Sequence, residues 1–349
     1  MPGTESLKLL ACGDINIQNR EDPTAVFARV KDILDAADLR IGNMEMALSS
    51  PDDIITAKHG WTQSDSRMVE ALTYAGFDAV TTANNVTFPA KAMLRSVDVL
   101  DENKIAHTGS GPTLAAARVP AIIEKDGTRI GLLGYSCIFY PLAHVASDTE
   151  PGVAVVRCVT AYEPHRRANE LPAAPPTVRS WPEPESLDMV REDVAKLRES
   201  VDIVITYFHM GVSSQEELTE YQRVLSRAMI DAGVDIVMGA SAHRPQAIEV
   251  YKDRVILYGL GNFAFDWWKV MHRKTGLLAE VTISDKAIQQ VSFRPVQRTD
   301  DEANLVEVVG VDSVHGREII ERVEELSEEF GTTFTRTGDS VVVWQRKAG

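Results

Sequence analysis

Short apolar segments alternate with amphipathic segments along most of the chain, which is the pattern of an α/β fold. The apolar run at 7–12 predicts a buried strand that ends at Gly13-Asp14, and an apolar stripe over 26–34 predicts a helix behind it. A strong turn signal at Asp126-Gly127 predicts a hairpin. Further strands are expected at 39–41, 78–82, 202–208, 235–238 and 255–258, and further helices at 66–74, 89–102, 187–198 and 216–232.

Two regions depart from this alternation. The many prolines between 140 and 184 predict a long surface excursion with little regular structure, which is either a plain loop insertion or a lid over a site. After Gly276 the pattern becomes strands with one helix, at about 317–328. We therefore expect one domain over residues 1–285, including the proline-rich insertion at about 140–184. Residues 286–349 are expected to form a C-terminal β/α extension that completes the same domain.

Polar side chains cluster at the carboxyl ends of the predicted strands. In α/β sheets ligands bind at that edge. Carboxylate, imidazole and amide groups are also the ligands that divalent metals choose, and two metals held close together can generate a hydroxide nucleophile. The residues concerned are Asp14, Asn43, Glu45, Asn84, Asn85, His209, His243 and Asn262.

Each of these residues also has a structural explanation when it is taken alone. Gly13-Asp14 could form a turn, and Asn84-Asn85 could cap the helix that follows. His209 could be a hydrogen-bonded core histidine, and His243, beside Arg244-Pro245, could lie in a surface turn. Their shared position at strand ends favours a site.

The order of these motifs resembles the CapA-type family, which is named for a protein of poly-γ-glutamate capsule synthesis and is assigned to the calcineurin-like metallophosphoesterase superfamily. The resemblance covers roughly residues 7–270 and implies a four-layer αββα sandwich with a site at the strand ends. The matching stretches are Gly13-Asp14, 37–45, 76–85, Gly109-Ser110-Gly111, 202–211, 231–239, His243 and 258–266.

The resemblance implies that five residues form the metal site, with Glu45 as the bridging carboxylate and Asn85 as an amide ligand. The predicted metal ligands are Asp14, Glu45, Asn85, His209 and His243. The predicted catalytic residues are His209, His243 and Glu45. The predicted substrate-binding residues are Asn84, Asn262, Arg244 and His59, which could also replace a lost histidine.

The chain departs from the family pattern at the centre of the site. Val86 stands where the family has a histidine after the paired asparagines, and Pro89 stands where an aspartate is expected. Ser241 replaces the first histidine of the Gly-x-His-x-His stretch, and Met210 and Ser213 replace a tryptophan and a glutamate. These changes remove a general acid and one metal ligand, so a simplified site with a single ion is one expectation.

Three functions follow from these residues. The first is a metal-dependent hydrolase that uses Zn, Mn, Fe or Ni on a small phosphate ester or a γ-glutamyl-like amide. The second is a metal-free or repurposed enzyme in which His209, His243 and Glu45 act as acid–base groups on a small organic substrate. The third is a non-catalytic accessory protein of poly-γ-glutamate synthesis.

Composition limits which binding partners and which cellular compartment we expect. The chain has 349 residues and a net charge of −15, which argues against nucleic acid and anionic membranes as partners. Three cysteines without metal-like spacing fit a reducing compartment, and no apolar stretch near the start is long enough for a signal peptide or a membrane span. We expect a cytoplasmic protein with a small-molecule substrate, and a homo-oligomer is compatible with the sequence.

Overall fold

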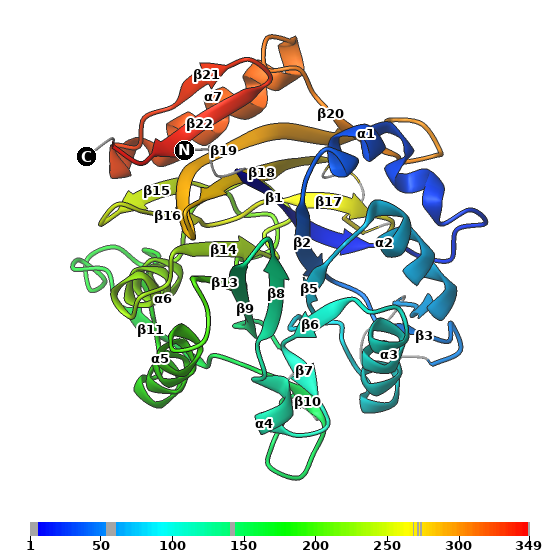
Figure 1. Ribbon diagram of the computed structural model, residues 1–349. Helices are drawn as coiled ribbons and strands as arrows, with labels where there is room; N and C mark the ends of the chain where they lie inside the picture. The colour runs from blue at the N-terminus through cyan, green and yellow to red at the C-terminus, as the bar shows by residue number, and fades with distance from the viewer. Residues whose placement is uncertain are drawn as a thin grey trace.

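Two β-sheets pack face to face and carry helices on their outer sides, as Figure 1 shows. The structure is a computed structural model that describes residues 6–53, 61–139, 144–267, 269–270, 272 and 274–347. Its layers run helix, sheet, sheet, helix, which confirms the predicted αββα sandwich.

In the described part of the chain the larger sheet has ten strands. They are β1 (Leu7–Asn16), β2 (Leu39–Met44), β5 (Ala79–Thr81), β6 (Ala106–Thr108), β17 (Asn262–Phe265), β18 (Thr275–Ser284), β19 (Ala287–Arg298), β20 (Val306–Val308), β21 (Thr335–Thr337) and β22 (Ser340–Gln345). Their order is β21-β22-β19-β18-β1-β2-β5-β6, with β17 paired to β1 and β20 paired to β19. Parallel pairing of β17, β1, β2 and β5 brings their carboxyl ends to one edge.

The second sheet has six strands among the described residues. They are β8 (Ala121–Lys125), β9 (Thr128–Ser136), β13 (Ile203–His209), β14 (Ile236–Ala240), β15 (Ile248–Tyr251) and β16 (Arg254–Leu257), in the order β15-β16-β14-β13-β9-β8. The antiparallel pair β8–β9 confirms the hairpin predicted around Asp126-Gly127. Short strand pairs are β3 (Leu48–Ser49) with β4 (Ser64–Asp65), and β7 (Ser110–Gly111) with β10 (Gly152–Val153).

Helices cover the outer face of each sheet (Figure 1). Beside the larger sheet lie η1 (Thr24–Val30), α1 (Lys31–Asp35), η2 (Ser66–Met68), α2 (Val69–Ala75) and α3 (Ala90–Glu102). Beside the second sheet lie α5 (Pro184–Arg198) and α6 (Glu220–Asp231). The remaining helices are α4 (Leu114–Ala117), α7 (Val314–Ser327) and η3 (Glu328–Phe330).

The period-two pattern of β1 explains the layering. Leu9 and Ala11 point between the two sheets, where they join one buried cluster with residues of β9, β13 and β14. Leu10 and Cys12 point the other way, into a second cluster beneath η1 and α2. Because side chains alternate across a strand, one apolar run can supply both layers.

Strand β1 is longer than the sequence predicted. It continues past Gly13-Asp14 to Asn16, because β17 adds parallel pairing in which Asp14 lies opposite Asn262. The two strands approach closely here: a Cβ on Gly13 would lie 1.8 Å from the carbonyl oxygen of Gly261. Asp14 therefore lies within the strand, beside a register shift, rather than in a turn after it.

The proline-rich insertion is more regular than expected. It contains β10 and an antiparallel ribbon of β11 (Cys158–Glu163) and β12 (Thr177–Pro182). The ribbon is attached to α6, because Glu220 binds both the Arg179 side chain, at 2.6 Å, and the Ser180 backbone N–H, at 3.0 Å. Cross-strand pairing of distant segments, which local composition does not reveal, accounts for the difference.

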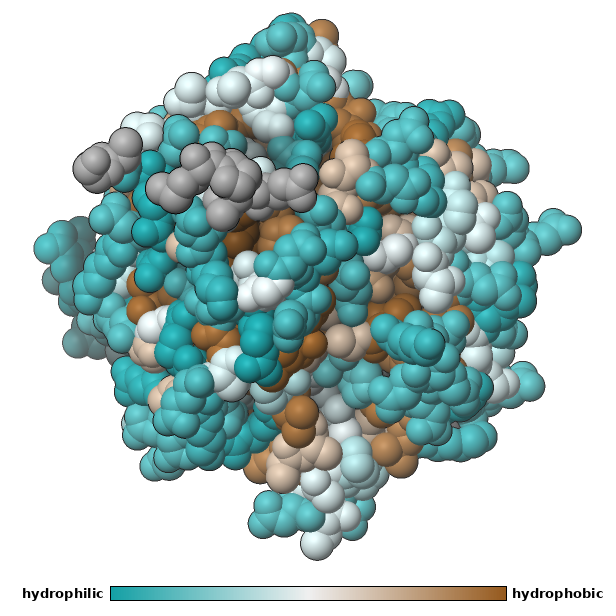
Figure 2. All heavy atoms as spheres, in the orientation of Figure 1, coloured by the Kyte–Doolittle hydropathy of each residue, from teal (hydrophilic) through white to brown (hydrophobic). Residues whose placement is uncertain are grey.

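Charged and polar side chains cover most of the face seen in Figure 2, and apolar side chains show mainly in the seams between elements. Residues 287–345 supply β19–β22 to the larger sheet as well as helix α7. Within the described residues, none of the helices has both the length and the hydropathy needed to cross a membrane.

Candidate metal centre

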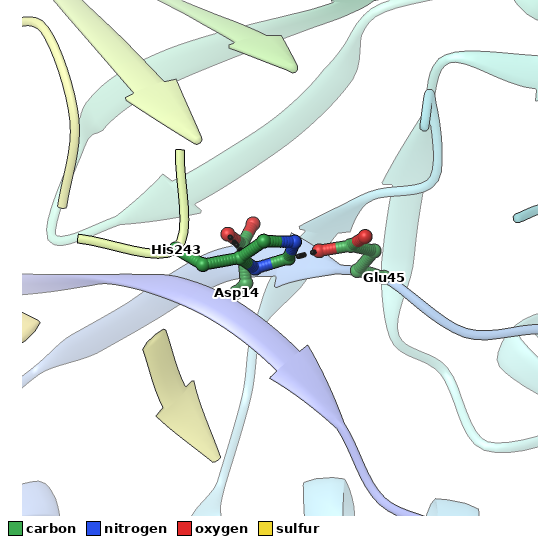
Figure 3. A group of neighbouring side chains, drawn as sticks. All are labelled: Asp14, Glu45 and His243. Carbon is green, nitrogen blue, oxygen red and sulfur yellow. Dashed lines mark ion pairs between the residues drawn. The ribbon is translucent and has the colours of Figure 1, made fainter. Parts of the chain in front are cut away.

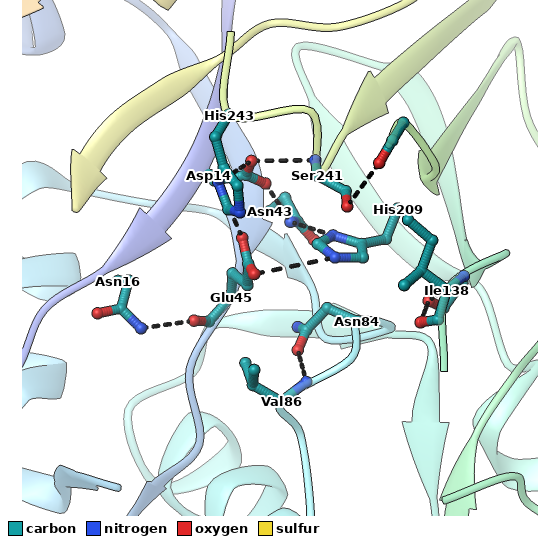
Figure 4. A network of polar contacts seen from close by, with 12 residues as sticks. Asp14, Asn16, Asn43, Glu45, Asn84, Val86, Ile138, His209, Ser241 and His243 are labelled. Carbon is teal, nitrogen blue, oxygen red and sulfur yellow. Dashed lines mark hydrogen bonds and ion pairs between the residues drawn. The ribbon is translucent and has the colours of Figure 1, made fainter. Parts of the chain in front are cut away.

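The carboxyl-terminal parts of β1, β2, β13 and β14, together with the start of β17, bring together most of the polar residues singled out in the sequence (Figure 4). Asp14 lies in β1, Glu45 follows β2, and His209 is the last residue of β13. His243 lies in the loop after β14, and Asn262 is the first residue of β17. All five side chains are buried.

Asp14 is held by two hydrogen bonds. The amide nitrogen Nδ2 of Asn43 donates to its Oδ1 at 2.7 Å, and the backbone N–H of Ser241 donates to its Oδ2 at 3.0 Å. Complete burial disfavours the charged carboxylate more than these donors favour it, so the pKa of Asp14 rises to about 7. A cation beside Asp14 would favour the charged carboxylate and lower its pKa again.

His243 lies between the two carboxylates, as Figure 3 shows. Its Nδ1 is 3.0 Å from Asn262 Oδ1, 3.5 Å from Asp14 Oδ2 and 3.8 Å from Glu45 Oε2. The ring also packs edge-on against Phe265, at 4.9 Å between centroids. These contacts on several sides fix the imidazole.

The loop that carries His243 adopts left-handed backbone conformations. The φ angles of Ser241 and His243 are +83° and +57°. Such conformations in residues other than glycine cost of order 1–3 kcal/mol each and cluster at functional sites. The surrounding contacts hold the loop in place, among them the bond from Ser241 Oγ to the Gly211 carbonyl at 3.1 Å.

Glu45 faces both histidines. Its Oε1 lies 3.9 Å from His209 Nε2 and its Oε2 lies 3.8 Å from His243 Nδ1, while its backbone carbonyl accepts from Asn16 Nδ2 at 2.8 Å. Glu45 is 3% exposed. Two buried carboxylates so close together are costly unless one is protonated or a positive charge compensates them.

The residues at this edge fit one divalent ion. Asp14, Glu45 and His243 each offer a ligand atom, and these atoms all lie within 4.8 Å of one another. Oxygen and imidazole ligands suit Zn, Mn, Fe and Ni. In addition, the buried Oδ1 of Asn85 has no hydrogen-bond partner among the described residues, as a fourth ligand would require.

The loop after β5 is apolar beside this group. Val86 is fully buried in a cluster with Trp61 and Phe88, against which Trp267 packs. Both ends of the Asn84 amide are hydrogen-bonded: Nδ2 donates to the carbonyls of Met44, at the end of β2, and Thr82, and Oδ1 accepts from Val86 N and Thr87 Oγ1. Both ends of the Asn84 amide are therefore occupied in this structure, and substrate binding by Asn84 stays a prediction.

The other predicted substrate-binding residues lie in different surroundings. Asn262 contacts His243, as described above. Arg244 pairs with Glu216 at 3.0 Å. His59 lies outside the described residues. Substrate binding by Arg244 and His59 remains a prediction.

Comparison with known proteins places this architecture in a family. Residues 8–267 match the model described as bacterial capsule synthesis protein PGA_cap. The chain belongs to the PGA_cap family. This assignment confirms the resemblance to CapA-type proteins that the sequence motifs indicated.

Two relatives and one solved structure illustrate the range of the family and fold. The capsule biosynthesis protein CapA of Bacillus anthracis is 24% identical, over 89% of this chain and 75% of its own length. A probable polyglutamine synthesis accessory protein of Mycobacterium tuberculosis is also 24% identical, over 88% of this chain and 77% of its own. A phosphatase structure from Mycoplasma pneumoniae superposes with a TM-score of 0.50 at 13% identity, covering 86% of this chain and 96% of the other, and so shares the fold.

Several residues that support the site were missed in the sequence. Asn16, in β1, donates to the backbone carbonyl of Glu45. Arg298 Nη1 and Asn304 Nδ2 both donate to the carbonyl of Phe265, whose ring packs on His243. The position of Asn16 beside Asp14 in the sequence was an available signal, whereas nothing local connects Arg298 or Asn304 to Phe265, 33 and 39 residues away in sequence.

Proposed function

We propose that this PGA_cap chain is a metal-dependent hydrolase that holds one divalent ion through Asp14, Glu45 and His243 and acts on a small phosphate ester or amide. The observation that supports this most is the convergence of two buried carboxylates and one imidazole within 4.8 Å. Without a cation that arrangement would place two acidic groups in a buried site with little compensation.

The chemistry of such a site divides between the ion and the chain. A bound divalent ion would supply a Lewis acid and lower the pKa of a bound water toward neutrality. Asn43 and the Ser241 backbone N–H orient the Asp14 carboxylate, and Asn262 orients the His243 ring. Burial of the site limits access by bulk water, which strengthens each electrostatic interaction within it.

A single ion is favoured over a pair by the residues at two substituted positions. Val86 and Ser241 stand where the family resemblance expects histidines, and neither side chain offers a strong ligand for a divalent ion. The Ser241 hydroxyl is bound to the Gly211 carbonyl. Val86 lies in an apolar cluster.

The proposal is tested by hydrolysis assays on metal-stripped protein reloaded with Zn²⁺ or Mn²⁺. Aryl phosphate mono- and diesters and γ-glutamyl anilides would serve as substrates. We expect turnover of at least one class that needs the metal and is lost in Glu45→Gln. Glu280→Gln is the matched control, because Glu280, on β18, is also buried but pairs with Lys8 and Arg294. Activity that survives both metal removal and Glu45→Gln would contradict the proposal.

An accessory role in polyglutamate synthesis is the second candidate function. It is favoured by the family and by relatives whose names describe capsule biosynthesis and polyglutamine synthesis. In that case the chain would bind its polymer or a synthase component without hydrolysing a bond. Binding of poly-γ-glutamate that is unchanged in Glu45→Gln, together with no metal-dependent turnover, would favour this role over hydrolysis.

A further inference from the structure

Two of the three cysteines lie together at the base of the proline-rich insertion. Cys137 directly follows β9, and its backbone N–H donates to the carbonyl of His209 at 3.0 Å. Cys158 is the first residue of β11. The pair therefore joins the end of a core strand to the start of the β11–β12 ribbon.

The two segments that carry these cysteines are held side by side by their neighbours. The backbone N–H of Ser136 donates to the carbonyl of Ala154 at 2.9 Å, and the Ser136 carbonyl accepts from the N–H of Val156 at 3.0 Å. The Arg157 guanidinium lies over the ring of Phe139, 5.3 Å from its centroid. Backbone pairing and side-chain stacking thus place residue 137 beside residue 158.

The two thiols interact directly. The Cys137 thiol hydrogen-bonds to the sulfur of Cys158. Both side chains pack against the buried cluster that includes Tyr221, and both residues are partly exposed. A disulfide holds its two sulfurs about 2.0 Å apart, and side-chain rotation can bring thiols that already interact to that distance.

The third cysteine is in different surroundings. Cys12 is 1% exposed and lies in the apolar cluster beneath η1 and α2, away from the cluster that Cys137 and Cys158 contact. Oxidation of a thiol depends on its exposure and on a second thiol nearby to resolve the first product. Cys12 is therefore an internal control for the reactivity of the pair.

We propose that Cys137 and Cys158 form a reversible disulfide, by exchange with a small-molecule disulfide, and that this bond fastens the base of the insertion to the end of β9. One cysteine thiolate attacks the small disulfide and releases one small thiol, and the other cysteine then attacks the mixed disulfide and releases the second. The two cysteines are oxidised, the small disulfide is reduced to two thiols, and the two cysteine protons end on those thiols. The inference is independent of the proposed hydrolase function.

The bond is tested by incubating the full chain with excess oxidised glutathione. The protein is then alkylated, unfolded and mapped by mass spectrometry of its peptides. We expect the loss of two of the three thiols, a peptide pair linked through Cys137 and Cys158, and recovery of all three thiols with dithiothreitol. Cys12 should react with the alkylating reagent only after unfolding. Free thiols at both Cys137 and Cys158, or a disulfide that includes Cys12, would overturn the proposal.

Serine variants test the two-step exchange. Cys137→Ser and Cys158→Ser each leave one thiol of the pair, so each should stop at the mixed disulfide with glutathione. Cys12→Ser is the matched control and should form the same linked peptide as the wild type. Mixed disulfides that accumulate in the wild type as much as in the single variants, without the linked peptide, would contradict the exchange.

Thermal unfolding tests the fastening role. The disulfide closes a loop of about 20 residues and so restricts the unfolded chain. The oxidised wild type should therefore unfold at a Tm a few degrees above that of the reduced protein. Cys158→Ser taken through the same treatment should show no such rise. A Tm of the wild type that is unchanged or lower after oxidation would show that the bond does not fasten the insertion.

Discussion

The site has two unequal halves. On one side β1, β2 and the loop after β14 present Asp14, Glu45 and His243 with their ligand atoms converging. On the other side, the loop after β5 presents Val86 within an apolar cluster, and the Asn84 amide hydrogen-bonds to the end of β2 and to its own loop. The first half keeps the residue types of a metal centre, and the second half has exchanged most of them for packing.

The difference shows at which positions of such a site an apolar side chain can replace a polar one in this fold. Val86 lies among apolar neighbours, where a buried side chain without polar atoms is stable. Asp14 and Glu45 carry carboxylates that are costly to bury, so their retention in the interior points to a ligand that offsets the cost. The predictions below test whether the two halves differ in this way.

Glu45→Gln should have the largest effect, because it removes a carboxylate that faces both histidines. In the wild type, Zn²⁺ at 100 times its Kd should raise the free energy of unfolding by about 2.7 kcal/mol. The variant should show almost none of this increase when the two are unfolded in urea with and without Zn²⁺. The buried Glu280→Gln control should keep the full increase, and an equal increase in all three proteins would disprove metal binding at Glu45.

Ser241→His asks whether a histidine at one of the substituted positions can restore a second metal site. Histidine tolerates the left-handed backbone that Ser241 already adopts, at a φ of +83°. The new imidazole should allow a second, weaker equivalent of Zn²⁺ to bind, as measured by calorimetric titration. Ser241→Ala should bind one equivalent, like the wild type. A wild type that already binds two equivalents would contradict the comparison of the halves.

The pH dependence of metal binding should report on Asp14. Burial raises the pKa of Asp14 to about 7 in the metal-free protein, and the ion binds the deprotonated carboxylate. Each pH unit below 7 should therefore weaken Zn²⁺ binding by about tenfold, with one proton released. The raised pKa also means that this group contributes less to the stability of metal-free protein as pH rises from about 4 to 7. Affinity that stays constant between pH 6 and pH 7 would show that Asp14 is not a ligand.

Asn304→Ala should have the smallest effect, because Asn304 supports the first half from outside. Its Nδ2 donates to the Phe265 carbonyl at 3.0 Å and to Asp266 at 2.9 Å. Loss of these buried bonds should lower the free energy of unfolding by about 1–3 kcal/mol and weaken Zn²⁺ binding by no more than about tenfold. The exposed Asn169→Ala is the control. A variant with wild-type stability would show that the C-terminal segment does not support the site.

The sequence predicted the parts of this molecule that depend on local pattern. The hairpin β8–β9 follows from Asp126-Gly127, and helix α3 follows from the apolar stripe between 89 and 102. Polar residues at strand ends were also visible, because parallel strands place their carboxyl ends at one edge whatever their order. For this reason Asp14, Glu45, His209 and His243 could be grouped before their contacts were known.

The remainder depends on contacts between distant segments. Composition alone predicted an irregular insertion, whereas β11 and β12 pair across the proline-rich stretch and attach to α6. The extension of β1 past Asp14 requires β17, which lies about 250 residues later in the chain. Neither pairing leaves a local signal, and the same holds for the support that Asn304 gives to Phe265.

The most direct test of a one-ion centre is the metal content of protein purified without chelator or metal-affinity resin, measured by elemental mass spectrometry. The account predicts one equivalent of Zn, Mn, Fe or Ni per chain, lost in Glu45→Gln and kept in Glu280→Gln. Two equivalents would mean that the half around Val86 still binds an ion. A complete absence that persists after soaking with these metals would contradict the hydrolase proposed here.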